Sequence, residues 1–260
     1  MAAGKMHSWD VSTQEARAIQ DGLRKKWVGV DARERIETVA GLDAAFVLKG
    51  SQALKNRGRA ALREANMAIG GVVLYKFPEM VELERVFACV ELRFPYVPGL
   101  LSFREIPVLL AALKKLKKMP DLLFCDGQGI AHPRRMGLAT HLGMLLGKPT
   151  IGCAKSILIG SHGKLRHKAG SWSALVDEKS GGEQVGVALR TRAGVAPIYV
   201  SQGNMVTLET AMRLTLAVTD GYRIPRPTRD ADRYVGQLKR SRAYQAAEYQ
   251  AWEQMQSSEK

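Results

Sequence analysis

Residues 120–137 read PDLLFCDGQGIAHPRRMG, and this stretch decides the fold class that we expect. Its apolar run, residues 122–125, has the length of a buried strand and is bounded by a proline and glycines. Asp126 follows directly, and then Gly127 and Gly129 let the backbone turn tightly and approach a ligand. In an open α/β sheet, ligands bind at the carboxyl ends of the strands. Asp126 is therefore either a metal ligand or a residue that caps the following turn.

The chain after this turn has the periodicity of a helix. Pro133 follows His132 at a first-turn position, where a helix leaves the backbone donor unused. The apolar side chains recur at helical spacing: Met136, Leu138, Leu142, Leu145 and Leu146. We therefore expect a helix that opens at His132 and Pro133.

Length and charge limit the class of protein. With 260 residues the chain can bury a substantial core, and a single α/β domain over residues 1–240, followed by a polar tail at 241–260, is the simplest organisation. The 39 Lys and Arg residues against 25 Asp and Glu leave a formal net charge of +14. Such a charge favours a polyanionic partner, most simply nucleic acid.

Cysteines and apolar runs indicate the compartment. Cys89, Cys125 and Cys153 lie in apolar, strand-like runs without a Cys-x-x-Cys pair, which favours buried free thiols in a reducing cytoplasm. The first ten residues lack the long apolar region of a secretory signal, and no apolar run approaches the length of a membrane span. We expect a cytoplasmic monomer with no membrane partner.

Hydrophobic periodicity predicts the remaining elements. Before residue 120 we expect helices over residues 13–27 and 102–119, and a meander of antiparallel strands at 38–47, 71–77 and 85–92. After residue 137 we expect strands at 149–154, 172–176, 184–190 and 196–200, a helix over 207–219, and a charged helix that opens at residues 225–228. Ser12 and Glu15 form a capping box for the first helix.

A basic segment separates the first two strands. Residues 49–66 carry five cations and one acid. We interpret the segment as an insertion that is either a solvated loop or a contact to phosphates. If it contacts phosphates, its deletion would flatten the salt dependence of nucleic-acid binding.

Three further acids need an interpretation. Asp43 stands inside the apolar strand at 38–47, where a carboxylate is costly unless it is paired or bound to metal. Asp31 also follows a short apolar run, but charged residues surround it, and we interpret it as a surface residue. Glu105 stands three residues after Ser102, and this spacing alone favours a capping box over a role in a site.

The order of these elements is that of a ribonuclease H-like fold. An early antiparallel meander carries Asp43, a later strand ends in Asp126, and helices lie between them. In that fold class, a mixed sheet flanked by helices, acids from separate elements converge on divalent metal. Two hard cations held by carboxylates can activate water and stabilise the leaving oxygen of a phosphodiester.

At this point the sequence closely resembles the endonuclease V family, the deoxyinosine 3′-endonucleases. The matching segments are VAGLD (39–43), FPYVPGLLSFRE (94–105), DGQGIAHPR (126–134), GCAKS (152–156), APIYVS (196–201) and RIPRPT (223–228). Together they span most of residues 8–240, and the second and third are long and specific.

The resemblance implies roles for six side chains. It implies that Mg²⁺, for which Mn²⁺ would substitute, is bound by three acids: Asp43, Glu105 and Asp126. Lys155 and His132 would lie near the reacting phosphate. Asp232 stands where some members have His and others Asp, so it would serve the metal directly or through water, or else complement a helix N-terminus.

The resemblance also implies how a damaged base is held. The loop Pro95-Tyr96-Val97-Pro98 resembles the family's wedge, which fills the space left when the lesion base turns out of the helix. Backbone groups would form the hypoxanthine pocket at Gly99, Leu101, Gly127, Gly129, Gly137 and Leu138. A stiff aromatic loop can replace the stacking lost on base flipping, which costs a few kcal/mol.

We therefore expect a Mg²⁺-dependent DNA repair endonuclease that recognises deoxyinosine. By resemblance it would hydrolyse the second phosphodiester bond 3′ to the lesion and leave 3′-hydroxyl and 5′-phosphate ends. One alternative keeps the chemistry and changes the substrate to inosine in single-stranded RNA. The other is a non-catalytic nucleic-acid-binding protein, against which three acids facing phosphate argue.

Overall fold

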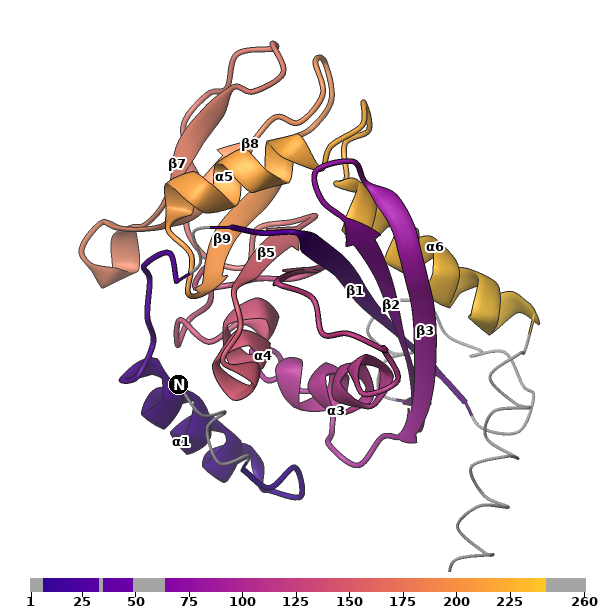
Figure 1. Ribbon diagram of the computed structural model, residues 1–260. Coiled ribbons are helices and arrows are strands. Elements are labelled where there is room, and N and C mark those ends of the chain that lie inside the picture. The colour runs from indigo at the N-terminus through magenta and orange to yellow at the C-terminus, as the bar shows by residue number, and fades with distance from the viewer. Residues whose placement is uncertain (1–6, 33–34, 49–63, 242–260) are drawn as a thin grey trace, which may run out of the picture.

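The computed structural model of the protein describes residues 7–32, 35–48 and 64–241, and these build one sheet with helices on both of its faces (Figure 1). The strands are β1 (Thr38–Val47), β2 (Met67–Lys76), β3 (Val81–Glu91), β4 (Leu122–Cys125), β5 (Thr150–Ala154), β6 (Ser161–His162), β7 (Trp172–Asp177), β8 (Glu183–Leu189) and β9 (Ile198–Asn204). The helices are α1 (Thr13–Arg24), α3 (Ser102–Leu113), α4 (Leu138–Leu146), α5 (Leu208–Ala217) and α6 (Arg226–Ser241), with a 3₁₀ turn η1 (Glu178–Ser180).

The sheet is mixed, with a parallel centre. Its strand order is β3-β2-β1-β4-β5-β9-β8-β7-β6, in which β1, β4 and β5 are parallel neighbours. The predicted antiparallel meander of β1, β2 and β3 is confirmed. All four residues of β4 are buried, as expected for a strand covered on both faces. The carboxyl ends of the parallel strands therefore meet at one edge, which is where ligands bind in such sheets.

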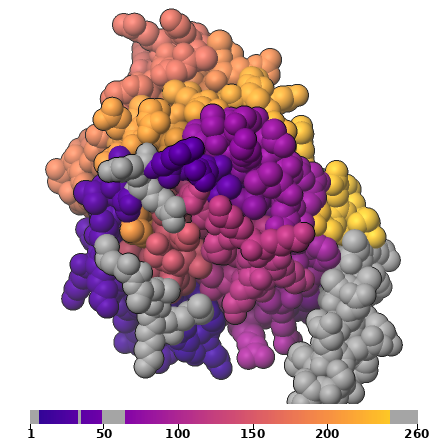
Figure 2. Space-filling model, in the orientation of Figure 1, coloured from indigo at the N-terminus to yellow at the C-terminus, as the bar shows by residue number. Residues whose placement is uncertain are grey.

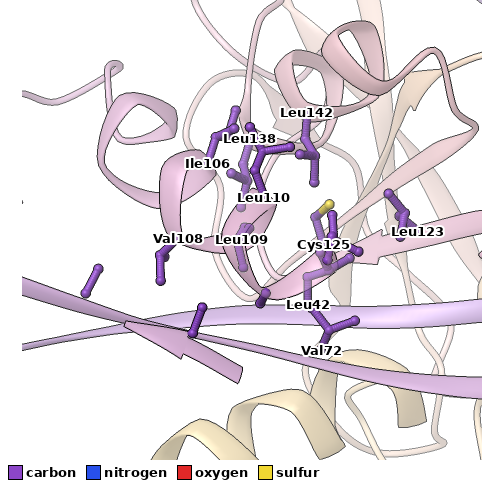
Figure 3. Close-up of a cluster of buried hydrophobic side chains, with 14 of the residues drawn as sticks. Leu42, Val72, Ile106, Val108, Leu109, Leu110, Leu123, Cys125, Leu138 and Leu142 are labelled. Atoms are coloured by element: carbon purple, nitrogen blue, oxygen red, sulfur yellow. The ribbon is translucent and has the colours of Figure 1, made fainter. Parts of the chain in front are cut away.

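Alternate residues of the central strands face two separate cores. On one face α3 and α4 pack against Leu42, Val72 and Leu123, and Figure 3 shows these side chains in one cluster with leucines of both helices. On the other face α5 and α6 pack against residues such as Val39 and Phe124. This alternation follows from the period of two in a strand.

Helix α6 lies unusually close to β1. A Cβ atom at Gly41 would overlap the backbone of Pro227 in α6, so only glycine fits at this position. The same helix contacts β2, where a Cβ at Gly71 would overlap Val235. This close approach is what brings the first turns of α6 to the middle of β1.

Several predicted boundaries agree with the structure and others are wrong. The strand at residues 38–47 is confirmed to the residue, and Ser12 and Glu15 do form the capping box of α1. Strands β2 and β3 each begin four residues earlier than predicted. In β2 the missed residues include Gly70, which gives a weak strand signal but lets α3 approach closely. In β3 they lie on the polar edge of the sheet, where exposed residues replace a clear alternation.

The helix predicted over residues 102–119 ends at Leu113, and its predicted cap does not form. The N-cap is Leu101, and the hydroxyl of Ser102 hydrogen-bonds instead to Nδ1 of His141, at 3.0 Å. The residues beyond the helix form turns, because four lysines crowd residues 114–118 and Pro120 disfavours helix in the residue before it. Glu105 is therefore free of the capping role that its spacing suggested.

The helix predicted to open at His132 and Pro133 begins instead at Leu138. Residues 132–137 form turns in which Arg135 has a φ of +55°. That left-handed conformation cannot continue a helix. Its cost is offset by a nearly buried guanidinium that pairs with Asp177 at 2.9 Å and Glu183 at 2.6 Å. The turn is thereby fixed against the β7–β8 hairpin.

The remaining sequence predictions concern the cysteines, membrane spans, the basic insertion and the polar tail. All three cysteines lie within the described residues and form no disulfide bond; Cys125 and Cys153 are buried and Cys89 is half-buried. Within the described ranges, no helix combines the length and the apolar character that crossing a membrane requires. Most of the basic insertion (49–63) and the tail after Ser241 lie outside the described residues.

Candidate active site

Three aspartates from three elements meet at the carboxyl edge of the parallel strands. Asp43 lies in β1, Asp126 follows the last residue of β4, and Asp232 lies in α6. The register pairs Leu42 with Cys125, so Asp43 and Asp126 follow neighbouring positions on parallel strands. One carboxylate oxygen from each aspartate lies within 4.8 Å of those from the other two. The arrangement could hold a hard divalent cation, for which carboxylate oxygens are the preferred ligands.

Glu105 lies beside this cluster but is not one of the residues whose carboxylate oxygens all lie within 4.8 Å of one another. It stands in the first turn of α3 and lines the same cavity as Asp126. Burial raises its pKa well above the ordinary value, and the charges of Asp43 and Asp126 raise it further. A fourth carboxylate therefore faces the acidic cluster.

The cluster is electrostatically unfavourable without a cation. Burial, followed by the charges of Asp126 and Asp232, raises the pKa of Asp43 to about 8. Burial also raises the pKa of Asp126. Carboxylates held this close together cannot all ionise at neutral pH unless positive charge is supplied. The donor set thus fits Mg²⁺ or Mn²⁺ in its chemistry as well as in its spacing.

Lys155 supplies part of that positive charge. It follows the last residue of β5, and its Nζ lies 2.5 Å from Oδ2 of Asp126 and 3.8 Å from Oδ1 of Asp232. These carboxylates raise the pKa of Lys155 even though its burial acts in the opposite direction. The ammonium group is therefore charged and fixed at the margin of the cluster.

A cavity of about 350 Å³ opens beside the acids. Among the residues predicted for the base pocket and the wedge, those that line it are Tyr96, Pro98, Gly99, Leu101, Gly127, Gly137 and Leu138. Three predicted residues do not line it. Pro95 is exposed, Val97 packs toward α1, and Gly129 donates its N–H to the hydroxyl of Ser201 in β9.

His132 lines the same cavity and braces the predicted wedge loop. Its side chain is buried, and that burial together with the charge of Arg134 lowers its pKa to about 4. The ring is therefore neutral at physiological pH. Its Nε2 donates to the carbonyl oxygen of Gly99, at 3.0 Å, and Nη2 of Arg134 donates to the same oxygen, at 2.7 Å. Gly99 itself has a φ of +78°, a conformation that glycine adopts without cost.

Some residues of the cavity wall could not be predicted from the sequence. Gln128 donates from Nε2 to the carbonyl of Ser156, at 2.8 Å, and so joins the loop after β4 to the loop after β5. Its Oε1 is buried and accepts no hydrogen bond from the described residues. Such an orphaned acceptor is rare in native structures and fits a wall that a ligand completes. Ile157 and Leu158, both exposed, form an apolar rim on the same side.

Two signals in the sequence bear on these missed residues. Gln128 stands between the two glycines of the DGQG segment, where the backbone approaches a ligand. Ile157 and Leu158 are apolar residues that directly follow Lys155 and Ser156. Neither signal identifies a cavity wall without the fold, because the two loops meet only through the pairing of β4 and β5.

The fold and the acidic cluster together define a ribonuclease H-like nuclease. The family model of endonuclease V matches residues 22–233. An endonuclease V from Roseiflexus sp. (strain RS-1) is 46% identical over 224 residues, which are 86% of this chain and 92% of that protein. This chain belongs to the endonuclease V family.

Solved structures agree with this assignment. The crystal structure of endonuclease V from Streptomyces avermitilis is similar with a TM-score of 0.79 and 38% identity, covering 91% of this chain and 96% of that one. A Ciona intestinalis endonuclease V variant, in complex with DNA containing an inosine followed by a ribo-adenosine, is similar with a TM-score of 0.71 and 26% identity. That match covers 88% of this chain and 99% of the other.

Proposed function

We propose that this DNA repair endonuclease recognises deoxyinosine and, with Mg²⁺, hydrolyses the second phosphodiester bond 3′ to the lesion. The observation that carries the proposal is the position of the acidic cluster, which opens directly onto a cavity between the Tyr96 loop and the loop after β4. The cavity volume lies near the lower limit of small-ligand sites, roughly 300–1,000 Å³. A single base turned out of a duplex is a ligand of suitable class, and the Ciona relative was crystallised with inosine-containing DNA.

Each part of the site has a role in this mechanism. Asp43, Asp126 and Asp232, together with Glu105, would hold the metal, which supplies Lewis-acid stabilisation of charge at the phosphate. Lys155 places a fixed positive charge beside the cluster, where a non-bridging phosphate oxygen can be bound. Neutral His132 fixes Gly99 and thereby the cavity wall. Water is the nucleophile, and no covalent enzyme intermediate is required.

The experiment that tests this function compares matched strands. Duplex and single-stranded DNA and single-stranded RNA, each with one inosine and each with adenosine in its place, are incubated with the protein and Mg²⁺. Cleavage of inosine DNA at the second 3′ bond, with little cleavage of the adenosine controls, is the expected result. Absence of cleavage at inosine in every substrate would contradict the proposal.

The same experiment tests inosine in RNA as a second substrate. The observation that favours it is the ribo-adenosine that follows inosine in the DNA bound by the Ciona relative, because this nucleotide carries a 2′-hydroxyl close to the lesion. Faster cleavage of inosine RNA than of inosine DNA would indicate that the protein is primarily an endoribonuclease.

Binding of Mg²⁺ to the protein should release protons. Asp43 has a pKa of about 8, so between pH 6 and 7 the metal must displace close to one proton from this carboxyl group. For each proton displaced, the apparent affinity for Mg²⁺ rises about tenfold when the pH is raised by one unit. Calorimetric titration in two buffers of different ionisation enthalpy measures the number of protons, and a value of zero would contradict the coupling.

The metal-free protein should lose stability as pH rises. The raised pKa of Asp43 means that the folded state binds more protons than the unfolded state between about pH 4 and pH 8. Its contribution to stability is fully present below pH 4 and is lost as pH approaches 8. Melting temperatures in a metal chelator should show this trend, and Mg²⁺ should raise the melting temperature more at pH 8 than at pH 6.

A further inference from the structure

The register of the sheet identifies which loops share an edge with the acids. Ala154 of β5 pairs with Tyr199 of β9, Tyr199 with Ala188 of β8, and Ala188 with Ser173 of β7, so the four residues form one row. Lys155 follows Ala154 on the side of the acidic cluster. Loops that extend beyond this row on the same side as Lys155 therefore lie at the edge of the sheet that carries the acids.

Two loops extend beyond the row. One, residues 163–171, enters β7, and the other, residues 190–197, leaves β8. Figures 1 and 2, which have the same orientation, show the chain around β7 and β8 as a lobe at the top of the molecule. The two loops stand next to each other, since the N–H of Gly194 donates to the carbonyl of His167, at 3.1 Å.

These loops carry cations without acids. Residues 156–176 and 184–208 contain no Asp or Glu at all. We call the exposed cations of the two loops the basic ledge: Lys164, Arg166, Lys168 and Arg192. Among the described residues, none of these four side chains takes part in an ion pair or a hydrogen bond. Their charge is therefore available to a partner.

Two other arginines fix the ledge to the active site. Arg190 donates from Nε to the carbonyl of Arg166, at 2.8 Å, and from Nη1 to the carbonyl of Val195, which joins the two loops. Arg223 donates from Nη2 to the carbonyl of Lys155, at 2.9 Å, and also to the carbonyl of Pro197, at 2.8 Å. Hydrogen bonds thus connect the ledge to the backbone of the lysine that faces the acids, and the distance between them is set by the fold.

We propose that the basic ledge binds the phosphates of the DNA duplex outside the bond that is cut. Cations without partners, fixed at the edge that carries the acids, match a polyanion whose charges repeat along its length. Such contacts position the duplex and add affinity without reading the lesion. The inference rests on the proposed function, because it takes the bound polymer to be the same DNA whose inosine enters the cavity.

The chain offers a matched control for this proposal. Four other exposed lysines, Lys114, Lys115, Lys117 and Lys118, follow the end of α3 and precede the start of β4. They therefore lie at the opposite edge of the sheet from the acids. Replacing either set by glutamine lowers the net charge by the same four units but removes charge from only one edge.

The test measures DNA affinity as a function of salt. The ledge variant (Lys164→Gln, Arg166→Gln, Lys168→Gln and Arg192→Gln) and the control variant (Lys114→Gln, Lys115→Gln, Lys117→Gln and Lys118→Gln) are titrated with an inosine-containing duplex. Each lost phosphate contact reduces the slope of log K against log salt by about 0.9, so the ledge variant should lose about 2 to 4 and the control less than about 1. Duplexes lengthened on one side of the lesion should show on which side the ledge acts.

The outcomes separate this inference from the proposed function. If the slope of log K against log salt is unchanged in the ledge variant, or falls equally in both variants, the proposal that the basic ledge binds phosphates is wrong. Preference for inosine over adenosine, measured in the same titrations, should be the same in all three proteins. Failure of the wild-type protein to prefer or cleave inosine would instead overturn the proposed function, while the salt slopes would still report on the ledge. Equal melting temperatures would establish that both variants are folded.

Discussion

Asp43→Ala and Asp126→Ala should each lower the rate of cleavage at inosine by at least about a thousandfold and leave lesion binding largely intact. The two carboxylates lie at the centre of the acidic cluster, on neighbouring parallel strands, with oxygens within 4.8 Å of each other. Loss of either removes metal stabilisation of the phosphate worth several kcal/mol. Because about 1.4 kcal/mol corresponds to a factor of ten, a loss of this size amounts to three or more orders of magnitude.

An acid elsewhere provides the control for this prediction. Asp31 accepts hydrogen bonds from the backbone N–H of Thr207, at 2.8 Å, and from the hydroxyl of Thr210, at 2.8 Å, and so caps α5. Asp31→Ala should lower the melting temperature and leave the rate of cleavage per folded molecule unchanged. Near wild-type nicking by Asp43→Ala or Asp126→Ala would show that the metal assignment is wrong.

Stability measurements give an independent readout of Asp43. In the metal-free protein at pH 9, Asp43→Asn removes a carboxylate that burial and neighbouring charge make unfavourable. The variant should therefore unfold at the same temperature as the wild type or higher, and Mg²⁺ should stabilise it less. A lower melting temperature for Asp43→Asn without metal would indicate that the carboxylate stabilises the fold directly.

The sequence identified the acids on strands only as candidates, because a carboxylate inside an apolar run is costly unless it is paired or bound to metal, and one directly after such a run either binds metal or caps a turn. Asp43 and Asp126 were found in this way, and the pairing of their strands brings them together. Glu105 was different, since a Ser-x-x-Glu pattern is indistinguishable from a capping box until the partner of the serine is known. That partner is His141, whose Nδ1 forms a hydrogen bond with the serine hydroxyl and which lies 39 residues away in the sequence.

Other features depend on tertiary contacts that periodicity does not contain. The helix after Ser102 was predicted six residues too long because Leu116 and Met119 preserve its apolar spacing, whereas four clustered lysines and Pro120 end it. The turn at Arg135 was predicted as helix because the ion pairs that stabilise its left-handed backbone come from β7 and β8. The wall formed by Gln128 and the Ile157 loop likewise exists only once β4 and β5 are paired.

Tyr96→Ala should weaken binding to inosine-containing duplex DNA by roughly 10- to 100-fold and weaken binding to single strands less. Stacking of a base on an aromatic ring contributes about 1–3 kcal/mol, and a duplex loses more stacking than a single strand when a base turns out. Tyr96 is half-buried at the margin of the cavity, in a loop fixed by the bonds to the Gly99 carbonyl. It belongs to none of the apolar core clusters, so the substitution should change the melting temperature little.

Tyr96→Phe is the matched control, because it keeps the aromatic face and removes only the hydroxyl. If Tyr96 acts by stacking at the site of the flipped base, the phenylalanine variant should bind duplex and single strands with nearly wild-type affinity. If the hydroxyl carries the effect, the phenylalanine and alanine variants should lose affinity alike. Equal losses of affinity on duplex and single strands for Tyr96→Ala, accompanied by a lower melting temperature, would show that the residue shapes the loop and is not a wedge.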